Sequence, residues 1–507
     1  MIRQYSRISF IIVFCLAFTG SPALASTYVE IEDHETYALL SYLEAVGVIQ
    51  DALLSTRPLS RREVVRLTRD AKRNAAERDS FVKSQVRALE QRVRPDEFRP
   101  ETLKAVDTAY VKYLLTDAEV LTLVYNNTLR EKEQAFNANN NGDLYDRGSN
   151  FRAGVTGRME EFGHFSAYLN PEVRASDETQ RMTLKKAYAV IGFTWIDIFV
   201  GKDSQWWGPG YNGSILFSNN AEPLTMLKFT APRPLQLPWV FKYLGPFQYS
   251  FFVTQLAKDR SDYPEPYFYG MRLNFKPHPY LELGLERTSI LGGSGRSTSL
   301  HTWLDSLFGS NEHTTPDTGD QRAGFDMKLT LPFKLQPLQV YWARAGEDSR
   351  QKTISMPYKF EDLVGIYLPR ILGFERIGLR AEYAVNHVKD WPNVWYYHGT
   401  YNAGYTNKDM VIGHHMGTDS RDLFLELGLL LPEKNARVLL SYDQKTHNLS
   451  LSVREVSDEV MLKTEILLTP RVSVTAFCGY GRIENPGNMP GPTQKVSEVE
   501  GEAQYRF

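Results

Sequence analysis

The clearest structural signal in the chain is its closing segment, EVEGEAQYRF at residues 498–507. Small and apolar residues alternate there with polar ones: Val499, Gly501, Ala503, Tyr505 and Phe507 against Glu498, Glu500, Glu502, Gln504 and Arg506. A period of two is that of a β-strand whose two faces meet different surroundings. We therefore expect an amphipathic strand. Such a strand with a terminal Phe looks like the assembly signal of bacterial outer-membrane barrels.

The same alternation recurs through residues 151–507. Apolar residues occupy every second position in the segments 269–275, 281–285, 325–331 and 423–431. A soluble β-sandwich also alternates, but three features favour a barrel in a membrane: strand-like segments of about ten residues, long loops on one side only, and aromatic residues at strand ends. About twenty residues per strand and loop predict about 16–18 strands. The expected fold class is mainly β, a large antiparallel transmembrane β-barrel.

Residues 26–136 show a helical period instead. We expect a small periplasmic α-helical bundle there, because short connections and a period of 3.6 are typical of helix bundles. Ser60 and Glu63 have the spacing of a capping box at the start of one helix. Further helices are predicted from residue 100 to about residue 114, and around residues 121–124.

Two segments flank this bundle. Residues 1–25 have the layout of a secretory signal peptide, with Arg3 and Arg7 before a short apolar run and small residues near Ala25. Residues 137–150 are predicted to be a turn-rich linker. The run NANNNG at its start resembles a calcium loop only in part, because the twelfth position is Gly148 rather than a bidentate Glu. The barrel is then expected at residues 151–507.

Composition excludes several classes of protein. The net charge of −2 over 507 residues argues against a nucleic-acid-binding protein, which normally carries a basic surplus. The basic run between residues 57 and 94 is better explained as a solvated helix surface than as a polyanion-binding face. No segment after the signal peptide offers the about 18 consecutive apolar residues of a membrane-spanning helix. Aromatic residues make up 12% of the chain, a generous share for a sequence this polar.

The most unusual stretch is DSQWWGPGYNG at residues 203–213. It contains a literal G-x-G-x-x-G, but Pro209 lies inside it and the residues that follow look extended, which excludes a dinucleotide fold. The adjacent Trp206 and Trp207 could stack on sugar rings while polar neighbours bond to sugar hydroxyls. The same tryptophans could instead be girdle or lumen-packing residues, and the residues alone slightly favour that alternative.

A second cluster runs from Trp391 through Trp395 and Tyr396 to GHHMGTD at residues 413–419. The two histidines are adjacent, so a strand would point them to opposite faces, which makes joint metal ligation awkward. We find no catalytic motif and expect no metal site or cofactor. Paired carboxylates for glycoside cleavage stay open as an alternative, because only geometry would reveal such a pair.

Two motifs together resemble a known family. The run GKDSQWWGPG at residues 201–210, continued by SNNAEP at residues 218–223, resembles the signature stretch of the capsule assembly protein Wzi family. Tyr405 and the segment 413–419 look like a second motif of that family. The resemblance implies an outer-membrane barrel of about eighteen strands with a periplasmic helical bundle at its base. It also implies a lectin-like, non-enzymatic protein that binds and anchors capsular or other exported polysaccharide at the cell surface.

The motif residues are our candidates for polysaccharide binding: Asp203, Gln205, Trp206, Trp207, Asn212, Asn219, Asn220, Trp395, Tyr396, His414 and Asp419. The expected partners are capsular or extracellular polysaccharide and outer-membrane lipid, with no nucleic acid, and the chain is expected to be a monomer. Two alternative functions stay open, a diffusion porin and a barrel-embedded glycan-modifying enzyme.

Overall fold

The computed structural model describes residues 25–95, 97–308, 319–349 and 357–507. Apart from Ala25, the predicted signal peptide lies outside the described residues. Among those residues, no helix combines the length and the apolar character needed to cross a membrane.

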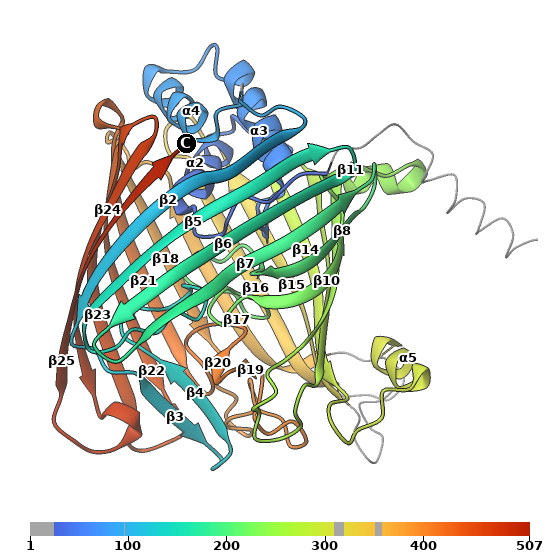
Figure 1. Cartoon of the computed structure of the whole chain (residues 1–507), viewed down its shortest axis with the longest axis vertical. Coiled ribbons are helices and arrows are strands. Elements are labelled where there is room, and N and C mark those ends of the chain that lie inside the picture. The colour runs from blue at the N-terminus through green and yellow to red at the C-terminus, as the bar shows by residue number, and fades with distance from the viewer. Residues whose placement is uncertain (1–24, 96, 309–318, 350–356) are drawn as a thin grey trace, which may run out of the picture.

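A closed antiparallel barrel dominates the structure (Figure 1). The described residues form 18 barrel strands, which confirms the predicted fold class and the upper end of the predicted count. Each strand pairs with the next one along the wall. The wall strands are β2 (Thr102–Thr116), β5 (Gly148–Phe162), β6 (Phe165–Ser176), β7 (Gln180–Gly192), β8 (Asp197–Asp203), β10 (Leu224–Thr230), β12 (Pro246–Gln255), β13 (Tyr267–His278), β14 (Leu281–Leu291), β15 (Gly319–Leu331), β16 (Leu338–Ser349), β17 (Pro357–Leu368), β18 (Ile377–Val385), β21 (Arg421–Leu431), β22 (Ala436–His447), β23 (Glu455–Thr469), β24 (Val472–Glu484) and β25 (Gln494–Arg506). The short β11 (Leu235–Gln236) extends the edge beside β12.

The barrel closes where its first strand meets its last. Strand β2 pairs with β25 in a register that runs from Thr108 opposite Arg506 to Thr116 opposite Glu498, and on its other side β2 pairs with β5. In hydrocarbon an open sheet edge would leave backbone N–H and C=O groups without partners. The pairing of β2 with β25 removes these open edges. The closing segment of the chain forms the predicted amphipathic strand and supplies one side of the seam.

The prediction for residues 100–136 was wrong. Residues 102–116 form the wall strand β2, and residues 121–133 form the hairpin of β3 (Leu121–Tyr125) and β4 (Leu129–Glu133). The apolar spacing fits a helix and a strand about equally, but β2 is rich in Val, Thr and Tyr, which favour strands. The pairing that stabilises β2 comes from the far end of the chain, and local periodicity cannot show it. The barrel therefore begins at residue 102 rather than 151.

The predicted linker at residues 137–150 is also revised. Its central residues Asn141 and Asp143 are buried, as is Tyr145, and β5 already begins at Gly148. The Asn141 amide N–H donates to the Asn219 carbonyl at 2.7 Å. The segment is thus a loop packed inside the barrel, not a spacer between two domains.

In the described part of the chain, three helices cover one end of the barrel: α2 (His34–Ala45), α3 (Arg61–Asn74) and α4 (Ser80–Val93). The predicted cap of α3 is present, because Ser60 Oγ accepts a hydrogen bond from the Glu63 amide at 3.2 Å. The apolar stripes of the helices pack against one another around Leu43, Leu67 and Leu89, all fully buried. The helical part is real but ends at residue 93.

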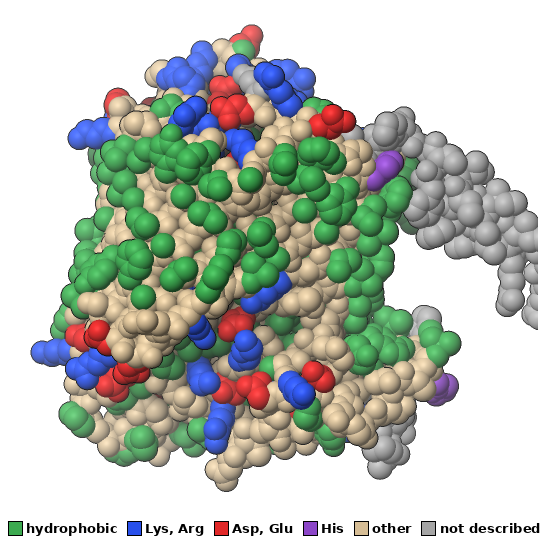
Figure 2. Space-filling model, viewed as in Figure 1, with side chains coloured by type: hydrophobic (Ala, Val, Ile, Leu, Met, Phe, Trp, Pro, Cys, Tyr) green, Lys and Arg blue, Asp and Glu red, His purple; other side chains and the backbone are tan. Residues whose placement is uncertain are grey.

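The wall separates its residue types by face. Outward-pointing side chains of the wall are exposed, among them Val111, Tyr113 and Leu115 of β2, Leu425, Leu427 and Leu429 of β21, and Leu440 of β22. Inward positions carry charges, and Arg272 and Arg322 are fully buried. Figure 2 shows hydrophobic side chains spread over the outer wall, with Lys, Arg, Asp and Glu gathered over the helices and toward the opposite end. An apolar exterior around a polar interior is the pattern of a barrel that spans a bilayer.

The two ends of the barrel differ in their connections. On the side of α2–α4, strands join by short turns, as at residues 163–164, 279–280 and 470–471. We call this the short-turn end, and its loops include the 3₁₀ helices η1 (Trp239–Leu244) and η2 (Pro432–Lys434). The other side, the long-loop end, carries the connections 117–147, 204–223 and 386–420 and the described residues 292–308 that follow β14. It also carries α5 (Leu300–Phe308) and η3 (Pro486–Asn488).

The lumen is filled by three segments that we call the plug, residues 25–60, 204–223 and 386–420, together with the loop 137–147. Glu44 of α2 fixes the first segment to the wall, since its carboxylate pairs with Lys276 at 2.7 Å and with Lys328 at 2.8 Å. Thr56 of β1 (Thr56–Arg57) accepts from Arg272 Nε at 2.8 Å. A charged cavity of about 440 Å³ is left between the plug and the wall near β2 and β23–β25.

We predict that Val111→Arg destabilises the barrel by about 2–4 kcal/mol, because it places a charge on the lipid-facing side near the middle of a spanning strand. Denaturant unfolding in phospholipid vesicles measures the effect. The control is Val124→Arg on the β3–β4 hairpin, an equally exposed valine outside the wall, expected to change stability by less than about 0.5 kcal/mol. Equal effects of the two variants would show that β2 is not in contact with lipid.

Candidate functional site

The loop 204–223 carries the first motif and folds back into the barrel. Trp206 and Trp207 form β9 (Trp206–Trp207), which pairs with β1 of the N-terminal segment, Thr56 opposite Trp207 and Arg57 opposite Trp206. The Gly208 amide donates to the Ser55 carbonyl at 2.8 Å. A segment that enters from the long-loop end thus meets one that enters from the short-turn end.

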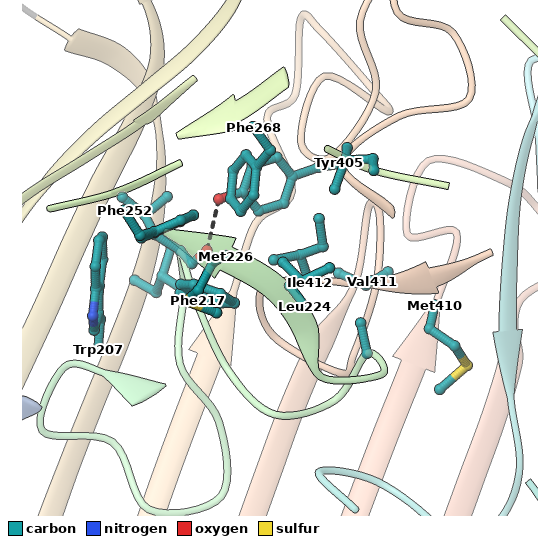
Figure 3. Packing of buried hydrophobic residues seen from close by; sticks show 14 of the residues in the cluster. Trp207, Phe217, Leu224, Met226, Phe252, Phe268, Tyr405, Met410, Val411 and Ile412 are labelled. Carbon is teal, nitrogen blue, oxygen red and sulfur yellow. Dashed lines mark hydrogen bonds between the residues drawn. The ribbon is translucent and has the colours of Figure 1, made fainter. Parts of the chain in front are cut away.

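Trp207 lies in the middle of an aromatic cluster. Its ring meets Phe217 edge-on at 5.6 Å and Phe252 edge-on at 5.4 Å between centroids, and none of its surface is exposed. Figure 3 shows these rings beside Phe268 and Tyr405, with residues 410–412 continuing the apolar contact. Trp206 is 3% exposed. Neither indole has a free face for a sugar ring, so of the two alternatives the structure supports lumen packing.

A single wall carboxylate holds the turn after the tryptophans. Glu382 of β18 accepts hydrogen bonds from the backbone amides of Tyr211 at 2.7 Å, Asn212 at 3.0 Å and Gly213 at 2.9 Å. It also accepts one from the Tyr341 hydroxyl at 2.8 Å. The glycine at 213 is required for packing, because a Cβ there would lie 2.0 Å from His414 Nε2. The turn is therefore bound to both the wall and the second motif.

The polar candidates of the first motif contact other residues of the plug, of the loop 137–147 and of the wall. The Asn220 side chain donates to the Val411 carbonyl at 3.0 Å, and the Asn219 side chain donates to the Asn139 carbonyl at 2.8 Å. The half-buried Asn212 donates to Asp422 at 3.2 Å. Gln205 accepts from Lys228 Nζ at 3.3 Å. Asp203 pairs with Lys186 at 3.5 Å.

The candidates of the second motif are also inside. Trp395 and Tyr396 are fully buried, and the Tyr396 hydroxyl donates to the Ile215 carbonyl and accepts from the His414 amide, each at 2.8 Å. Asp419 accepts from the Ser450 amide at 2.9 Å. The structure therefore brings the two motifs together, as a framework inside the barrel and not as an exposed surface. Contact with polysaccharide stays a prediction for these residues.

One aromatic residue of the second cluster does face solvent at the long-loop end. Trp391 is 54% exposed, and Lys359 Nζ lies 4.2 Å from its ring centroid. Trp391 belongs to this sequence cluster, but only Trp395 and Tyr396 of its aromatic residues are predicted from the sequence to bind polysaccharide. The charged neighbours Lys389 and Asp390 could have indicated that Trp391 is exposed, because two charged residues directly before a tryptophan in a loop favour a position at the surface.

Two groups of histidine and carboxylate side chains come close enough to hold a metal ion among the described residues. One consists of His414, His415 and Asp422, in which the two imidazole rings stack at 4.7 Å. Burial lowers the pKa of His414 well below its usual range. Burial alone would also lower the pKa of His415, but hydrogen bonds to Asp422 and Asp443 raise it to about 9. The second group is Glu133, His447 and Glu455.

The comparisons with known proteins identify the family. The model of the capsule assembly protein Wzi family matches residues 127–497. The chain belongs to this family. The family assignment made from the two motifs is confirmed.

Two relatives of this Wzi-family barrel illustrate the relationship. A 55.8 kDa protein in the cps region of Klebsiella pneumoniae is 29% identical over 341 residues, a match that covers 66% of this chain and 60% of that relative. The chain therefore spans less than two thirds of that relative's length. The structure of Escherichia coli Wzi, described as a carbohydrate-binding β-barrel involved in group 1 capsule assembly, has a TM-score of 0.73 and 21% identity. That match covers 95% of this chain and 100% of the other, and it shows the shared fold.

For this Wzi-family barrel we predict that Trp207→Ala lowers the free energy of unfolding by about 3–5 kcal/mol, because the indole fills a fully buried position. Denaturant unfolding of the refolded protein measures the change. The control Trp239→Ala alters an 84% exposed tryptophan at the short-turn end and should have an effect below about 0.5 kcal/mol. A Trp207→Ala variant of normal stability that no longer binds polysaccharide would instead favour the stacking role.

We further predict that Glu382→Gln loosens the loop 204–223, because an amide nitrogen replaces one of the oxygens that accept backbone N–H groups, and each buried N–H left unpaired costs about 1–3 kcal/mol. Planar-bilayer recordings should show discrete openings of the variant where the wild type stays closed. Glu433→Gln changes an exposed carboxylate that pairs with Arg376, and it should leave the recordings unchanged. Identical traces for wild type and Glu382→Gln would contradict the anchoring role.

Proposed function

We propose that this protein binds capsular or other exported polysaccharide at the cell surface and does so without catalysis. The observation that carries the proposal is the plugged lumen, in which three segments of the chain are fixed to the wall and to one another. A diffusion porin needs an open polar passage, so a plug of this kind disfavours that alternative. The surface of the long-loop end is then the part of the molecule that can bind a ligand outside the cell.

The orientation follows from the connections between strands. Outer-membrane barrels have short turns toward the periplasm and longer loops outside. We therefore assign the short-turn end and the helices α2–α4 to the periplasm, and the loops 117–147, 204–223 and 386–420 to the outer side. The outward-facing apolar wall contacts outer-membrane lipid, and the chain acts as a monomer.

Trp391 is our proposed contact for the sugar chain. Its indole is exposed and rigid, and C–H faces of pyranose rings pack well on such a surface. The adjacent Lys389 and Asp390 are exposed and can bond to hydroxyl or carboxylate groups of the ligand. The buried residues of both family motifs act indirectly, since they hold the loop 386–420 in the shape that presents Trp391.

The relatives support the class of ligand. Escherichia coli Wzi is described as carbohydrate-binding and as involved in capsule assembly, and the Klebsiella relative is a cps-region protein. The arrangement of titratable groups favours binding over catalysis. The carboxylates of Glu382 on the wall and Asp419 in the plug are buried and accept backbone hydrogen bonds, so they are not positioned on an open surface where a glycan-modifying enzyme would hold its substrate.

The test is binding of surface polysaccharide, extracted from the host bacterium, to the immobilised barrel. We predict that Trp391→Ala weakens binding about fivefold, which corresponds to about 1 kcal/mol for a lost aromatic contact. Trp239→Ala removes an exposed tryptophan at the opposite end and should leave affinity unchanged. Unchanged affinity of Trp391→Ala would exclude this contact, and release of oligosaccharide during the assay would favour the enzymatic alternative.

A further inference from the structure

The group Glu133, His447 and Glu455 lies where the β3–β4 hairpin meets the wall. Glu133 is on β4, His447 ends β22 and Glu455 begins β23. His447 Nε2 is 3.1 Å from Glu133 Oε2 and 3.8 Å from Glu455 Oε1. The side chains of His447 and Glu455 are fully buried, and that of Glu133 is 17% exposed. The cluster therefore lies in the interior of the protein, and of its three side chains only Glu133 is in contact with solvent.

The contact of His447 Nδ1 with Ser420 determines which ring nitrogen of His447 carries the proton. Ser420 Oγ donates its hydrogen to the Thr418 carbonyl at 2.7 Å, so at 3.2 Å from His447 Nδ1 it can only accept. Nδ1 therefore carries the proton. In the neutral ring, the lone pair of Nε2 is directed into the cluster that also holds the two carboxylates.

Within the described part of the chain, two buried polar atoms of the cluster lack a hydrogen bond of their own. Neither His447 Nε2 nor Glu455 Oε1 has a hydrogen-bond partner among the described residues, although both are buried. Glu133 Oε2 is close to Nε2 but lies off the axis along which an N–H bond would point. Two side chains that bind the same metal ion are arranged in this way. Their ligand atoms lie close together without a hydrogen bond between them, because the lone pair of each ligand atom points at the ion.

We propose that Glu133, His447 and Glu455 bind a divalent transition-metal ion of the zinc class. Zn²⁺ takes imidazole nitrogen and carboxylate oxygen at about 2.0–2.2 Å, and tetrahedral angles then place ligand atoms about 3.4 Å apart. The distances of 3.1 Å and 3.8 Å lie on either side of that value. One imidazole with two carboxylates favours Zn²⁺ over Ca²⁺, which prefers oxygen ligands only.

The surroundings of the site orient its ligands. Metal-binding histidines usually donate the other ring N–H to a fixed acceptor, and Ser420 supplies that acceptor here. The second oxygen of Glu455 accepts from the Gly487 amide, which leaves Oε1 directed at the cluster. Lys445, on the same face of β22, is held by Glu459 at 2.9 Å.

The other histidine group is less suited to a metal ion. His414 Nδ1 accepts from the Met416 amide at 3.2 Å, and its Nε2 faces Gly213 closely. His415 Nδ1 lies 3.3 Å from the Asn139 side-chain amide, and its Nε2 pairs with Asp422 at 2.9 Å. Gly213 therefore occupies the space beside His414 Nε2, and His415 lies between Asn139 of the loop 137–147 and Asp422 on the wall.

A bound ion would connect the β3–β4 hairpin to the wall between β22 and β23. The hairpin is already held two residues before Glu133, where Glu131 accepts from the Thr418 amide at 2.9 Å and from the Thr418 hydroxyl at 2.6 Å. The metal would complete the attachment of the hairpin at the long-loop end. Its removal should free the hairpin without unfolding the barrel.

The experiment uses the full-length mature protein without a histidine tag. After incubation with ZnCl₂ and dialysis, elemental analysis should find about one zinc ion per folded chain, and X-ray absorption at the zinc edge should show a single imidazole with oxygen ligands. We predict that Glu133→Gln and His447→Ala each weaken zinc binding at least tenfold, and that Ser420→Ala weakens it about tenfold. Zinc removal should also increase protease cleavage within residues 117–134.

The matched control is His301→Ala, which removes an exposed histidine that pairs with Asp305 on α5 and should leave zinc binding unchanged. Heat-dependent mobility in gels identifies the folded fraction of every variant, and Glu133→Gln tests the site with little change of shape. No zinc on the wild type, or equal zinc on the wild type and both ligand variants, would overturn the proposal. Polysaccharide binding is measured separately, so failure of the metal site would leave the proposed function standing.

Discussion

The structure depends on the pairing of β2 with β25. A sheet that enters a bilayer must satisfy every backbone N–H and C=O group internally, and a closed barrel is the only way for a sheet to do so. Here the strand after the helices and the strand at the far end of the chain provide the two edges that join. All other wall pairs link neighbouring strands of the meander, so this one long-range pair converts an open sheet into a cylinder.

Closure creates an interior, and the interior is filled by charge-paired segments of the same chain. Glu44 joins α2 to Lys276 and Lys328, and Glu382 holds the backbone of the loop 204–223. Removing one partner of such a buried pair leaves an uncompensated charge, which makes these contacts specific for one arrangement of the plug. A rigid plug in turn gives the loops at the long-loop end a fixed base, as a binding surface requires.

The family motifs illustrate that a conspicuous sequence motif can have a structural role. The Trp206–Trp207 pair looks like a sugar platform, but Trp207 packs against Phe217 and Phe252 and pairs with β1. Trp391 has less distinctive neighbours and is the exposed ring. Local sequence cannot distinguish the two cases, because exposure depends on whether another segment covers the residue. The proposed metal ligands show the same limitation, since Glu133 is separated from His447 by more than three hundred residues.

The sequence by itself determined the alternation of the wall, the apolar exterior and the helices with the Ser60 cap, because each depends on residues close together in the chain. It also identified the family. Only the tertiary structure decided that residues 102–116 form a strand, since their spacing suits either element and β25 supplies the pairing. It likewise decided that both motifs are buried, because segments entering from opposite ends of the barrel meet there and exclude water from the aromatic cluster.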